Sequence, residues 1–231
     1  MYKKKFFELF IFIFILITFC FAEQQSLAKI NYVYLLRTSF VMMGLLALSI
    51  VCVAFVVERL IYFKKISYNV SKYMKEIEEL VKDNDFDTIL KISKNKKNPI
   101  TNKVNMFIEN KDISRIEIEE LYEIVRAKEK NNMEKFMVIL GAGSTVAPLL
   151  GLLGTVTGIM SAFASLAASG SGGPSVIAAG VAEALVTTAF GLIIGIPVLI
   201  IYNIISDKIK TYLNEMDMAF GMLLFLLKKK D

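Results

Sequence analysis

Long apolar segments alternate with polar ones along the chain, and three of them have the length of a membrane-spanning helix. They are residues 38–57, 141–165 and 180–202. A helix of about 20 apolar residues crosses the hydrocarbon core of a bilayer. The first segment contains no charged residue, whereas the last contains Glu183. The pattern therefore predicts an integral membrane protein of the all-α class with three spans.

The chain begins with a segment that has the order of a secretory signal. In residues 1–22, three lysines precede a core rich in Phe and Ile, and Ala22 stands before a polar stretch. This order predicts cleavage near Ala22. The alternative is an additional, uncleaved membrane helix. Residues 23–37 are then expected to form a short N-terminal segment in the periplasm.

Residues 58–135 form a polar region of mixed charge that contains no glycine and has Pro99 as its only proline. The lack of helix-breaking residues favours a helical domain. The expected helices are Ser67–Lys82, Phe86–Ser93 and Ile113–Lys135, with a turn at Lys94–Pro99. We expect the last of these helices to continue into the second span, because neither glycine nor proline separates them.

The distribution of lysines predicts which side of the membrane each segment occupies. Two consecutive lysines follow the first span closely, and lysines favour the cytoplasmic side. The 58–135 domain and the tail at residues 206–231 are therefore expected in the cytoplasm, the tail as an amphipathic helix. Residues 169–175 read SGSGGPS and are expected to turn on the opposite side. Residues 136–205 then form a hairpin of the second and third spans.

The second and third spans each gather small and hydroxyl residues on one face of a helical wheel. This face of the second span comprises Ser144, Ala147, Gly151, Gly154, Gly158, Ala162 and Ser165. The same face of the third span comprises Gly180, Ala184, Thr187, Thr188, Gly191 and Gly195. Small residues spaced four apart let helices approach closely in lipid, so we interpret these six glycines as packing residues. Pro148 and Pro197 are expected to bend their helices.

Close helix packing does not require Glu183 or the threonines, since small apolar residues would serve it equally well. A charged side chain at the centre of a bilayer costs about 2.5–3.5 kcal/mol on insertion scales, so an acid there predicts a functional role. Thr155, Thr187 and Thr188 could each bond back to a carbonyl one turn earlier, which is a purely structural role. Together with the acid, they suggest instead a polar strip that lines a narrow lumen.

Composition narrows the chemistry further. The chain has 231 residues, of which 55% are hydrophobic, and a net charge of +5. It contains no histidine, which excludes imidazole metal sites and histidine proton relays. Its two cysteines lie within apolar runs and predict neither a disulfide framework nor a zinc site. No nucleophile–base pair is visible, so we expect neither an enzyme nor a cofactor. Lysines that flank apolar segments indicate a lipid bilayer, and not nucleic acid, as the partner of the basic residues.

Two sequence motifs resemble those of one family. Ala147–Met160 reads APLLGLLGTVTGIM, and Gly180–Asn203 reads GVAEALVTTAFGLIIGIPVLIIYN. These long, specific patterns resemble the MotA/TolQ/ExbB proton-channel family, and they are most similar to its ExbB and TolQ branches. The resemblance is tight over residues 135–205 and looser over residues 38–65 and the tail.

The resemblance implies a subunit of a proton-driven motor in the bacterial inner membrane. Such subunits form a homo-oligomeric ring, a pentamer, whose second and third spans surround an ExbD-like or TolR-like partner with a single span. Proton entry then drives a TonB-like or TolA-like protein that crosses the periplasm. By this resemblance Thr155 and Thr188 are lumen threonines beside the partner's aspartate, and Glu183 is the intramembrane glutamate.

Three interpretations of the function are left open. The first is an ExbB-type subunit that energises outer-membrane import through a TonB-like protein. The second is a TolQ-type subunit of the Tol-Pal envelope system, which uses the same kind of motor. The third is a passive membrane scaffold that anchors a periplasmic partner. A substrate transporter is disfavoured, because the sequence shows no inverted repeats and a single intramembrane charge.

Overall fold

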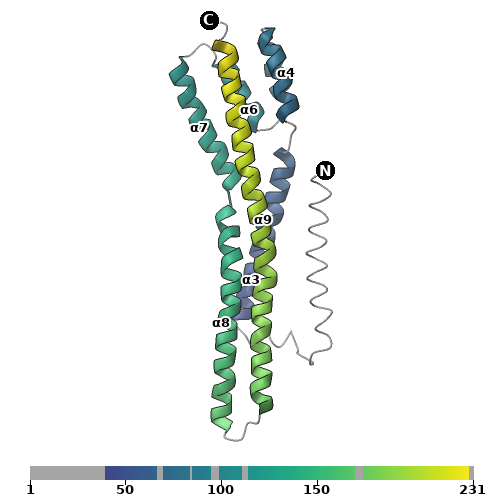
Figure 1. The fold of residues 1–231 in the computed structure, drawn as a ribbon, viewed down its shortest axis with the longest axis vertical. Helices are drawn as coiled ribbons and strands as arrows, with labels where there is room; N and C mark the ends of the chain where they lie inside the picture. The colour runs from purple at the N-terminus through teal and green to yellow at the C-terminus, as the bar shows by residue number, and fades with distance from the viewer. Residues whose placement is uncertain are drawn as a thin grey trace. The chain divides into compact units, whose positions relative to one another are not determined.

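The computed structural model describes residues 40–66, 70–83, 85–94, 99–110, 114–169 and 174–228, and in these ranges every regular element is an α-helix. The helices are α3 (Phe40–Ile66), α4 (Val70–Lys82), α5 (Phe86–Lys94), α6 (Pro99–Glu109), α7 (Arg115–Glu134), α8 (Met137–Ser169) and α9 (Pro174–Lys228), as labelled in Figure 1. The signal-like segment 1–22 and residues 23–37 lie outside the described residues.

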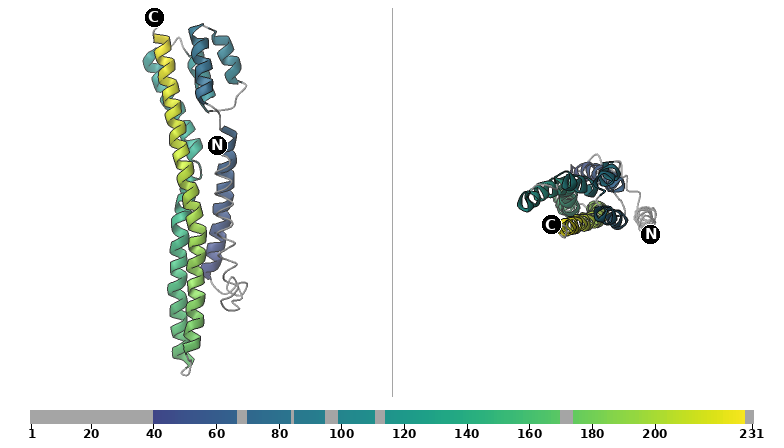
Figure 2. Two further views of the ribbon diagram at one scale, coloured as in Figure 1. Left: turned by 45° about the vertical axis from the view of Figure 1, so that its right-hand side comes forward. Right: turned by 90° about the horizontal axis from the view of Figure 1, so that it is seen from above.

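Among the described residues, three helices are long and apolar enough to cross a membrane, and they cover the three predicted spans apart from residues 38–39, which lie outside the described ranges. These helices are α3, α8 and α9. In Figures 1 and 2, α8 and the first half of α9 lie side by side as the two arms of the predicted hairpin. Helix α9 has 55 residues and continues without interruption from the third span through the predicted tail. The chain is therefore an all-α, multi-pass membrane protein.

Contacts among residues divide the chain into two compact units. Of the described residues, unit 1 holds those up to Val56 together with Ile139–Tyr202, and unit 2 holds Val57–Val138 together with those from Asn203 onward. Unit 1 therefore contains the apolar hairpin, and unit 2 contains the polar region of the sequence.

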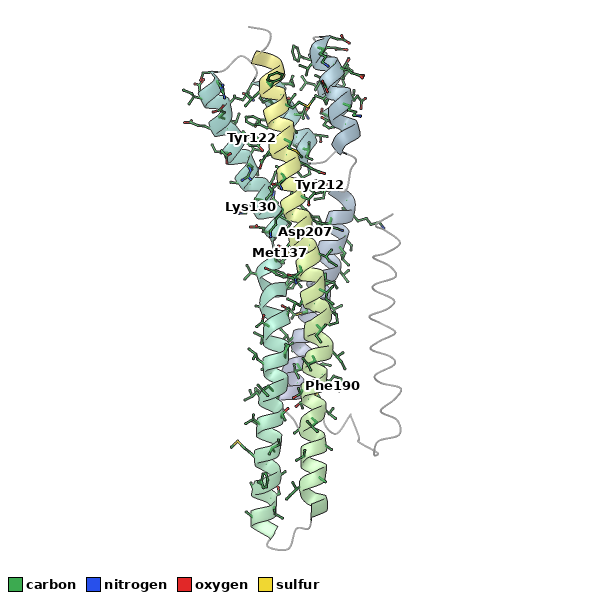
Figure 3. All side chains as sticks on the ribbon, viewed as in Figure 1. Tyr122, Lys130, Met137, Phe190, Asp207 and Tyr212 are labelled. Carbon is green, nitrogen blue, oxygen red and sulfur yellow. The ribbon has the colours of Figure 1, made fainter. Side chains whose placement is uncertain are left out.

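Unit 1 has a small apolar core to which three helices contribute. Met42 and Leu45 of α3 pack with Ala147 of α8 and Val186 of α9. Phe190, marked in Figure 3, is one of the partly buried side chains around this cluster. Most large apolar side chains of the hairpin are exposed instead, including Leu149, Leu152, Met160, Phe163, Leu185, Leu192 and Ile196. An extended apolar surface of this kind is expected of helices that contact lipid.

The predicted continuous helix from residue 113 into the second span is wrong. Helix α7 ends at Glu134, α8 begins at Met137, and Phe136 between them has a φ of 66°. A positive φ is uncommon in residues other than glycine and must be held by the surrounding structure. The guanidinium of Arg59 lies over the Phe136 ring, 5.6 Å from its centroid. The break is thus supported by a residue of a different helix.

Helix α7 has a defined start and a defined end. At its start, the Ser114 hydroxyl accepts a hydrogen bond from the Glu117 backbone N–H at 3.3 Å, and the Glu117 carboxylate accepts one from the Ser114 N–H at 2.9 Å. At its end, Arg59 Nη1 donates to the carbonyl groups of Asn132 at 3.1 Å and Met133 at 3.2 Å. Both ends therefore satisfy backbone groups that a helix leaves unpaired.

Helix α6 is an element that the sequence did not predict. It begins at Pro99, which is favourable in the first turn of a helix because proline lacks only an N–H that would have no helical partner there. Its buried side chains include Ile100, Val104 and Phe107. The predicted turn at Lys94–Pro99 falls mostly on residues 95–98, which lie outside the described ranges.

Unit 2 has a core of large apolar and aromatic side chains. Its most deeply buried members include Tyr73, Ile77, Ile89, Phe107, Met133, Ile205, Met216 and Leu223. The Phe107 ring of α6 meets the Phe220 ring of α9 edge to face, with 5.6 Å between the centroids. The Tyr122 ring of α7 stacks on the same Phe220 ring at 3.7 Å. Aromatic contacts therefore join α6, α7 and α9.

Candidate functional site

The small-residue faces of α8 and α9 meet each other within one chain. A Cβ atom placed on Gly151 would lie 3.0 Å from the carbonyl oxygen of Thr187 and 3.0 Å from the Cα atom of Thr188. A Cβ atom on Gly191 would lie 2.5 Å from the carbonyl oxygen of Ala147. Real Cβ contacts are longer than this, so a larger residue would force the two backbones apart. The hairpin is held by close backbone approach, as in other helix pairs in lipid.

The other four predicted packing glycines face the same interface. The nearest contacts that an added Cβ atom would make are Thr187 for Gly154, Ala184 for Gly158, Ala162 for Gly180 and Pro148 for Gly195. The last three of these contacts would be 2.8, 2.5 and 2.7 Å long. All six glycines therefore lie where the helices are closest.

Thr155 of α8 and Thr188 of α9 face each other across this interface, and their hydroxyl groups are hydrogen-bonded to each other. The Thr188 hydroxyl lies 3.0 Å from the carbonyl oxygen of Gly151. The Thr155 hydroxyl lies 3.2 Å from the same oxygen and 3.3 Å from the carbonyl oxygen of Ala184. Both side chains are half-buried. Two hydroxyls and a shared carbonyl thus form one polar cluster in an apolar hairpin.

This threonine pair has two hydrogen-bonding arrangements that need no movement of heavy atoms. In one, Thr188 donates to the Gly151 carbonyl and Thr155 donates to Thr188. In the other, Thr155 donates to a carbonyl and Thr188 donates to Thr155. Either arrangement uses both hydroxyl protons and leaves oxygen lone pairs free. The pair can therefore accept a hydrogen bond from another donor, such as a protonated carboxylic acid, without losing one of its own.

Thr187 lies deeper in the hairpin than this pair. Its side chain is 3% exposed, and its hydroxyl donates to the Ala184 carbonyl at 2.7 Å. The same hydroxyl lies 3.3 Å from the Gly151 carbonyl of the other helix. The Thr187 hydroxyl is thus occupied by backbone groups of both helices, and its place in a lumen stays a prediction.

The remaining predicted site residues have known places on the helices. Glu183 lies one turn before Thr187 in α9, and its side chain lies outside the described ones. Pro148 and Pro197 lie inside α8 and α9 without ending either helix. Their bending role stays a prediction. In the described part of the chain, no group of three or more Cys, Asp or Glu side chains could hold a metal ion.

Two further glycines pack closely although the sequence analysis did not select them. A Cβ atom on Gly143 would clash with the Cys52 sulfur of α3, and one on Gly141 would lie 3.2 Å from the Tyr202 ring of α9. Gly143 thus brings α3 against the hairpin. The signal was present in the sequence, because both glycines precede the predicted small-residue face of the second span by no more than one turn.

Comparison with known proteins places the hairpin in a family. A model of the MotA/TolQ/ExbB proton channel family matches residues 91–218. A biopolymer transport protein ExbB from Pseudomonas putida is 38% identical over 109 residues, which are 47% of this chain and 33% of that protein. A Tol-Pal system protein TolQ from Haemophilus influenzae is 35% identical over 94 residues, which are 41% of this chain and 40% of that protein. The matched region thus spans less than half the length of each relative.

A solved structure extends the likeness to the fold. The structure of C. jejuni MotAB resembles this chain with a TM-score of 0.59 at 17% sequence identity, over 92% of this chain and 88% of that chain. At this identity the likeness concerns the fold alone. The family model, in contrast, covers more than half of the chain, including both arms of the hairpin. The chain belongs to the MotA/TolQ/ExbB proton channel family.

Proposed function

We propose that this protein is the proton-channel subunit of an ExbB–ExbD type motor in the bacterial inner membrane, which energises a TonB-like protein for outer-membrane import. Several copies, a pentamer by resemblance to the family, surround a single-span ExbD-like partner in the lipid bilayer. The 58–135 domain and the tail lie in the cytoplasm. The observation that carries the proposal is the Thr155–Thr188 hydroxyl pair inside an apolar hairpin.

The proton is carried by a carboxyl group of the partner that passes the threonine pair. A protonated acid donates to a free lone pair of the hydroxyls. An ionised acid needs a hydroxyl proton, so one threonine must release the Gly151 carbonyl, which costs about 0.5–1.5 kcal/mol. A hydrogen bond to a charged group returns about 1.5–3 kcal/mol. The pair therefore binds both forms of the acid and prefers neither strongly.

This small preference suits a motor driven by the membrane potential. A proton motive force of about 150 mV supplies roughly 3.5 kcal/mol per proton. The difference between the two hydrogen-bonding states is smaller than this driving force, so the proton can leave the site again. Thr187 holds the two backbones together behind the pair, and Glu183 supplies a second acid one turn away along α9.

A TolQ-type role is the second candidate, and the similarity to the Haemophilus influenzae TolQ favours it. The two roles share the motor and differ in what it drives. Deletion of the gene separates them, because loss of iron or cobalamin uptake supports the ExbB-type role. Detergent sensitivity and chains of undivided cells support the TolQ-type role instead.

The proposal is tested by removing the Thr188 hydroxyl without changing the size of the side chain. Thr188→Val is expected to lower energised uptake roughly tenfold, which corresponds to about 1.4 kcal/mol in a rate. The matched control is Thr157→Val, because Thr157 is exposed on α8 and bonds only to carbonyls of its own helix, those of Leu153 at 3.0 Å and Gly154 at 3.2 Å.

Assembly is measured in parallel, by co-purification of the variant with its single-span partner from detergent extracts. Normal uptake by an assembled Thr188→Val complex would contradict the lumen role of the threonines. It would favour the passive scaffold instead. Loss of uptake in the Thr157→Val control would show that the assay reports helix packing and not the hydroxyl pair.

A further inference from the structure

A buried lysine of unit 2 lacks a hydrogen-bond partner. Lys103 of α6 is 6% exposed, and its ammonium group makes no hydrogen bond within the described part of the chain. The Nζ atom lies 4.2 Å from the centroid of the Tyr122 ring of α7, which Figure 3 marks. An ammonium has three donors that water normally satisfies. Its burial is therefore unfavourable even with the attraction of the aromatic face.

The walls around Lys103 are almost entirely apolar. A small cavity between α6 and α9 is lined by Lys103 together with Ile100, Val104, Met216, Ala219, Phe220 and Leu223. None of these six neighbours has a nitrogen or oxygen atom in its side chain. The ammonium thus has little to replace the water that it loses when α6 packs onto α9.

Among the acidic groups that attract the Lys103 ammonium, Asp217 of α9 has the largest effect. Its carboxylate oxygens, however, already accept hydrogen bonds from other residues. Arg126 of α7 donates to Asp217 from Nε at 2.7 Å and from Nη2 at 2.9 Å, and the Tyr122 hydroxyl donates to the same carboxylate. The titratable and charged groups that face Lys103 are Tyr122, Glu123, Arg126 and Glu129 of α7 and Asp217 of α9. They attract the ammonium from a distance without bonding to it.

We propose that Lys103 makes α6 a proton-dependent flap of unit 2. When Lys103 is protonated, α6 opens more often from α7 and α9, because opening returns the ammonium to water. When the amine is neutral, α6 stays docked, because a neutral amine tolerates an apolar cavity. The pairing of α7 with α9 does not depend on this step, since Arg126 and Asp217 hold those two helices together.

The direction of the pH response follows from the pKa of Lys103. Burial lowers this pKa from 10.5 to about 8, and attraction by Asp217 and Glu129 opposes the shift only in part. The docked form therefore binds fewer protons than the open form between about pH 8 and 10.5, so docking strengthens as pH rises through that window. Below about pH 8 both forms are protonated and docking is at its weakest. From pH 7 to pH 9 the opening constant is expected to fall about tenfold.

The flap rests on the geometry of unit 2. It does not rest on the proposed function, because the response lies between about pH 8 and 10.5 and uses no group of the hairpin. The two are separable, because Thr188→Val is expected to lower energised uptake roughly tenfold while leaving the pH response of α6 unchanged.

The test is amide hydrogen exchange of the full chain in lipid nanodiscs at pH 7 and pH 9, corrected for the intrinsic pH dependence of exchange. Protection of α6 amides is expected to rise about tenfold in the wild type. In Lys103→Met, which keeps the length and apolar stem of the side chain, protection is expected to be high at both pH values. The control is Lys91→Met on α5, an exposed lysine, which is expected to behave as the wild type.

Equal α6 protection at the two pH values in the wild type would overturn the proposal, as would the same pH response in Lys103→Met. A second measurement needs no variant to fold, namely carbon-13 NMR of the Lys103 Cε atom in labelled wild-type protein. A titration midpoint near pH 8 is expected. A midpoint near 10.5 would show a solvated ammonium and end the proposal.

Discussion

The interface between α8 and α9 in unit 1 and the core of unit 2 bury different kinds of side chain. The closest contacts between α8 and α9 are made by small and hydroxyl residues such as Ala147 and Thr187, while Leu152 is 55% exposed. Unit 2 buries large side chains such as Phe107 and Met216 almost completely. Each unit is built from helices of the same chain, and α9 contributes to both.

The difference is the one expected between helices that associate in lipid and helices that associate in water. In lipid, burying a leucine gains little, so helices associate through close backbone contact and hydrogen bonds. In water, the burial of large apolar side chains is the main stabilising contribution. The interface of unit 1 can therefore hold paired threonines at little cost, whereas an unpaired lysine in unit 2 weakens the packing around it.

The largest expected effect is the difference in stability loss between Phe107→Ala in unit 2 and Leu152→Ala in unit 1. Phe107→Ala removes a ring that is 1% exposed and is expected to lower the free energy of unfolding of unit 2 by about 3–5 kcal/mol. Leu152→Ala removes a side chain that faces outward and is expected to change stability in nanodiscs by less than about 1 kcal/mol. Denaturant unfolding in nanodiscs measures the free energy of unfolding of both variants. Similar losses would show that the outer surface of unit 1 is a protein core.

The next effect sharpens the claim that unit 1 is held by close backbone approach. Gly191→Ala places a methyl group 2.5 Å from the Ala147 carbonyl oxygen and is expected to lower stability by about 1–3 kcal/mol. Gly44→Ala is the matched control, because nothing lies within 4 Å of that position and alanine favours helix. Thermal unfolding in nanodiscs compares the two. Equal stabilities would contradict the glycine interface.

A third effect concerns the end of α7 in unit 2, where Arg59 donates hydrogen bonds to backbone carbonyl groups. Arg59→Met leaves the carbonyl groups of Asn132 and Met133 without their donor, which is expected to cost about 1–3 kcal/mol. Amide exchange should report faster opening at the end of α7. The control, Lys64→Met, changes an exposed cation of the same helix. If both variants leave α7 equally protected, Arg59 does not support the break between α7 and α8.

The smallest effect concerns the start of α7. Ser114→Ala removes the hydroxyl that caps the helix and is expected to cost about 1 kcal/mol, seen as faster exchange in the first turn of α7. Glu117→Gln keeps a side chain that can return to the Ser114 N–H and should cost less. An equal loss in both variants would show that charge, and not the capping geometry, stabilises this end.

The membrane hairpin could be predicted from the sequence because its signals are local. Span length, helical periodicity and the small-residue face all follow from residues close in the chain. The same periodicity put Thr188 on the small-residue face of the third span and Thr155 beside that of the second, but it did not predict that their hydroxyl groups bond to each other. A helical wheel could not show that Thr187 is buried inside the hairpin while its neighbour Thr188 is half-buried, because the difference depends on how the two helices pack.

The features that could not be predicted depend on contacts between distant residues. No glycine or proline marks the break at Phe136, and Arg59, which lies over its ring, comes from a different helix. Helix α6 follows a stretch rich in lysine and asparagine that is typical of a turn. Lys103 looks like a solvated residue in the sequence, since lysines are almost never fully buried.

The most direct test of the central claim is the proton flux of purified complexes, reconstituted with their single-span partner in vesicles that hold a pH-sensitive dye and a fixed membrane potential. Thr188→Ser keeps the hydroxyl and is expected to retain at least about half of the wild-type flux. Thr188→Val lacks it, and the flux is expected to fall about tenfold. A Thr188→Val complex that is assembled and conducts protons at the wild-type rate would contradict the account.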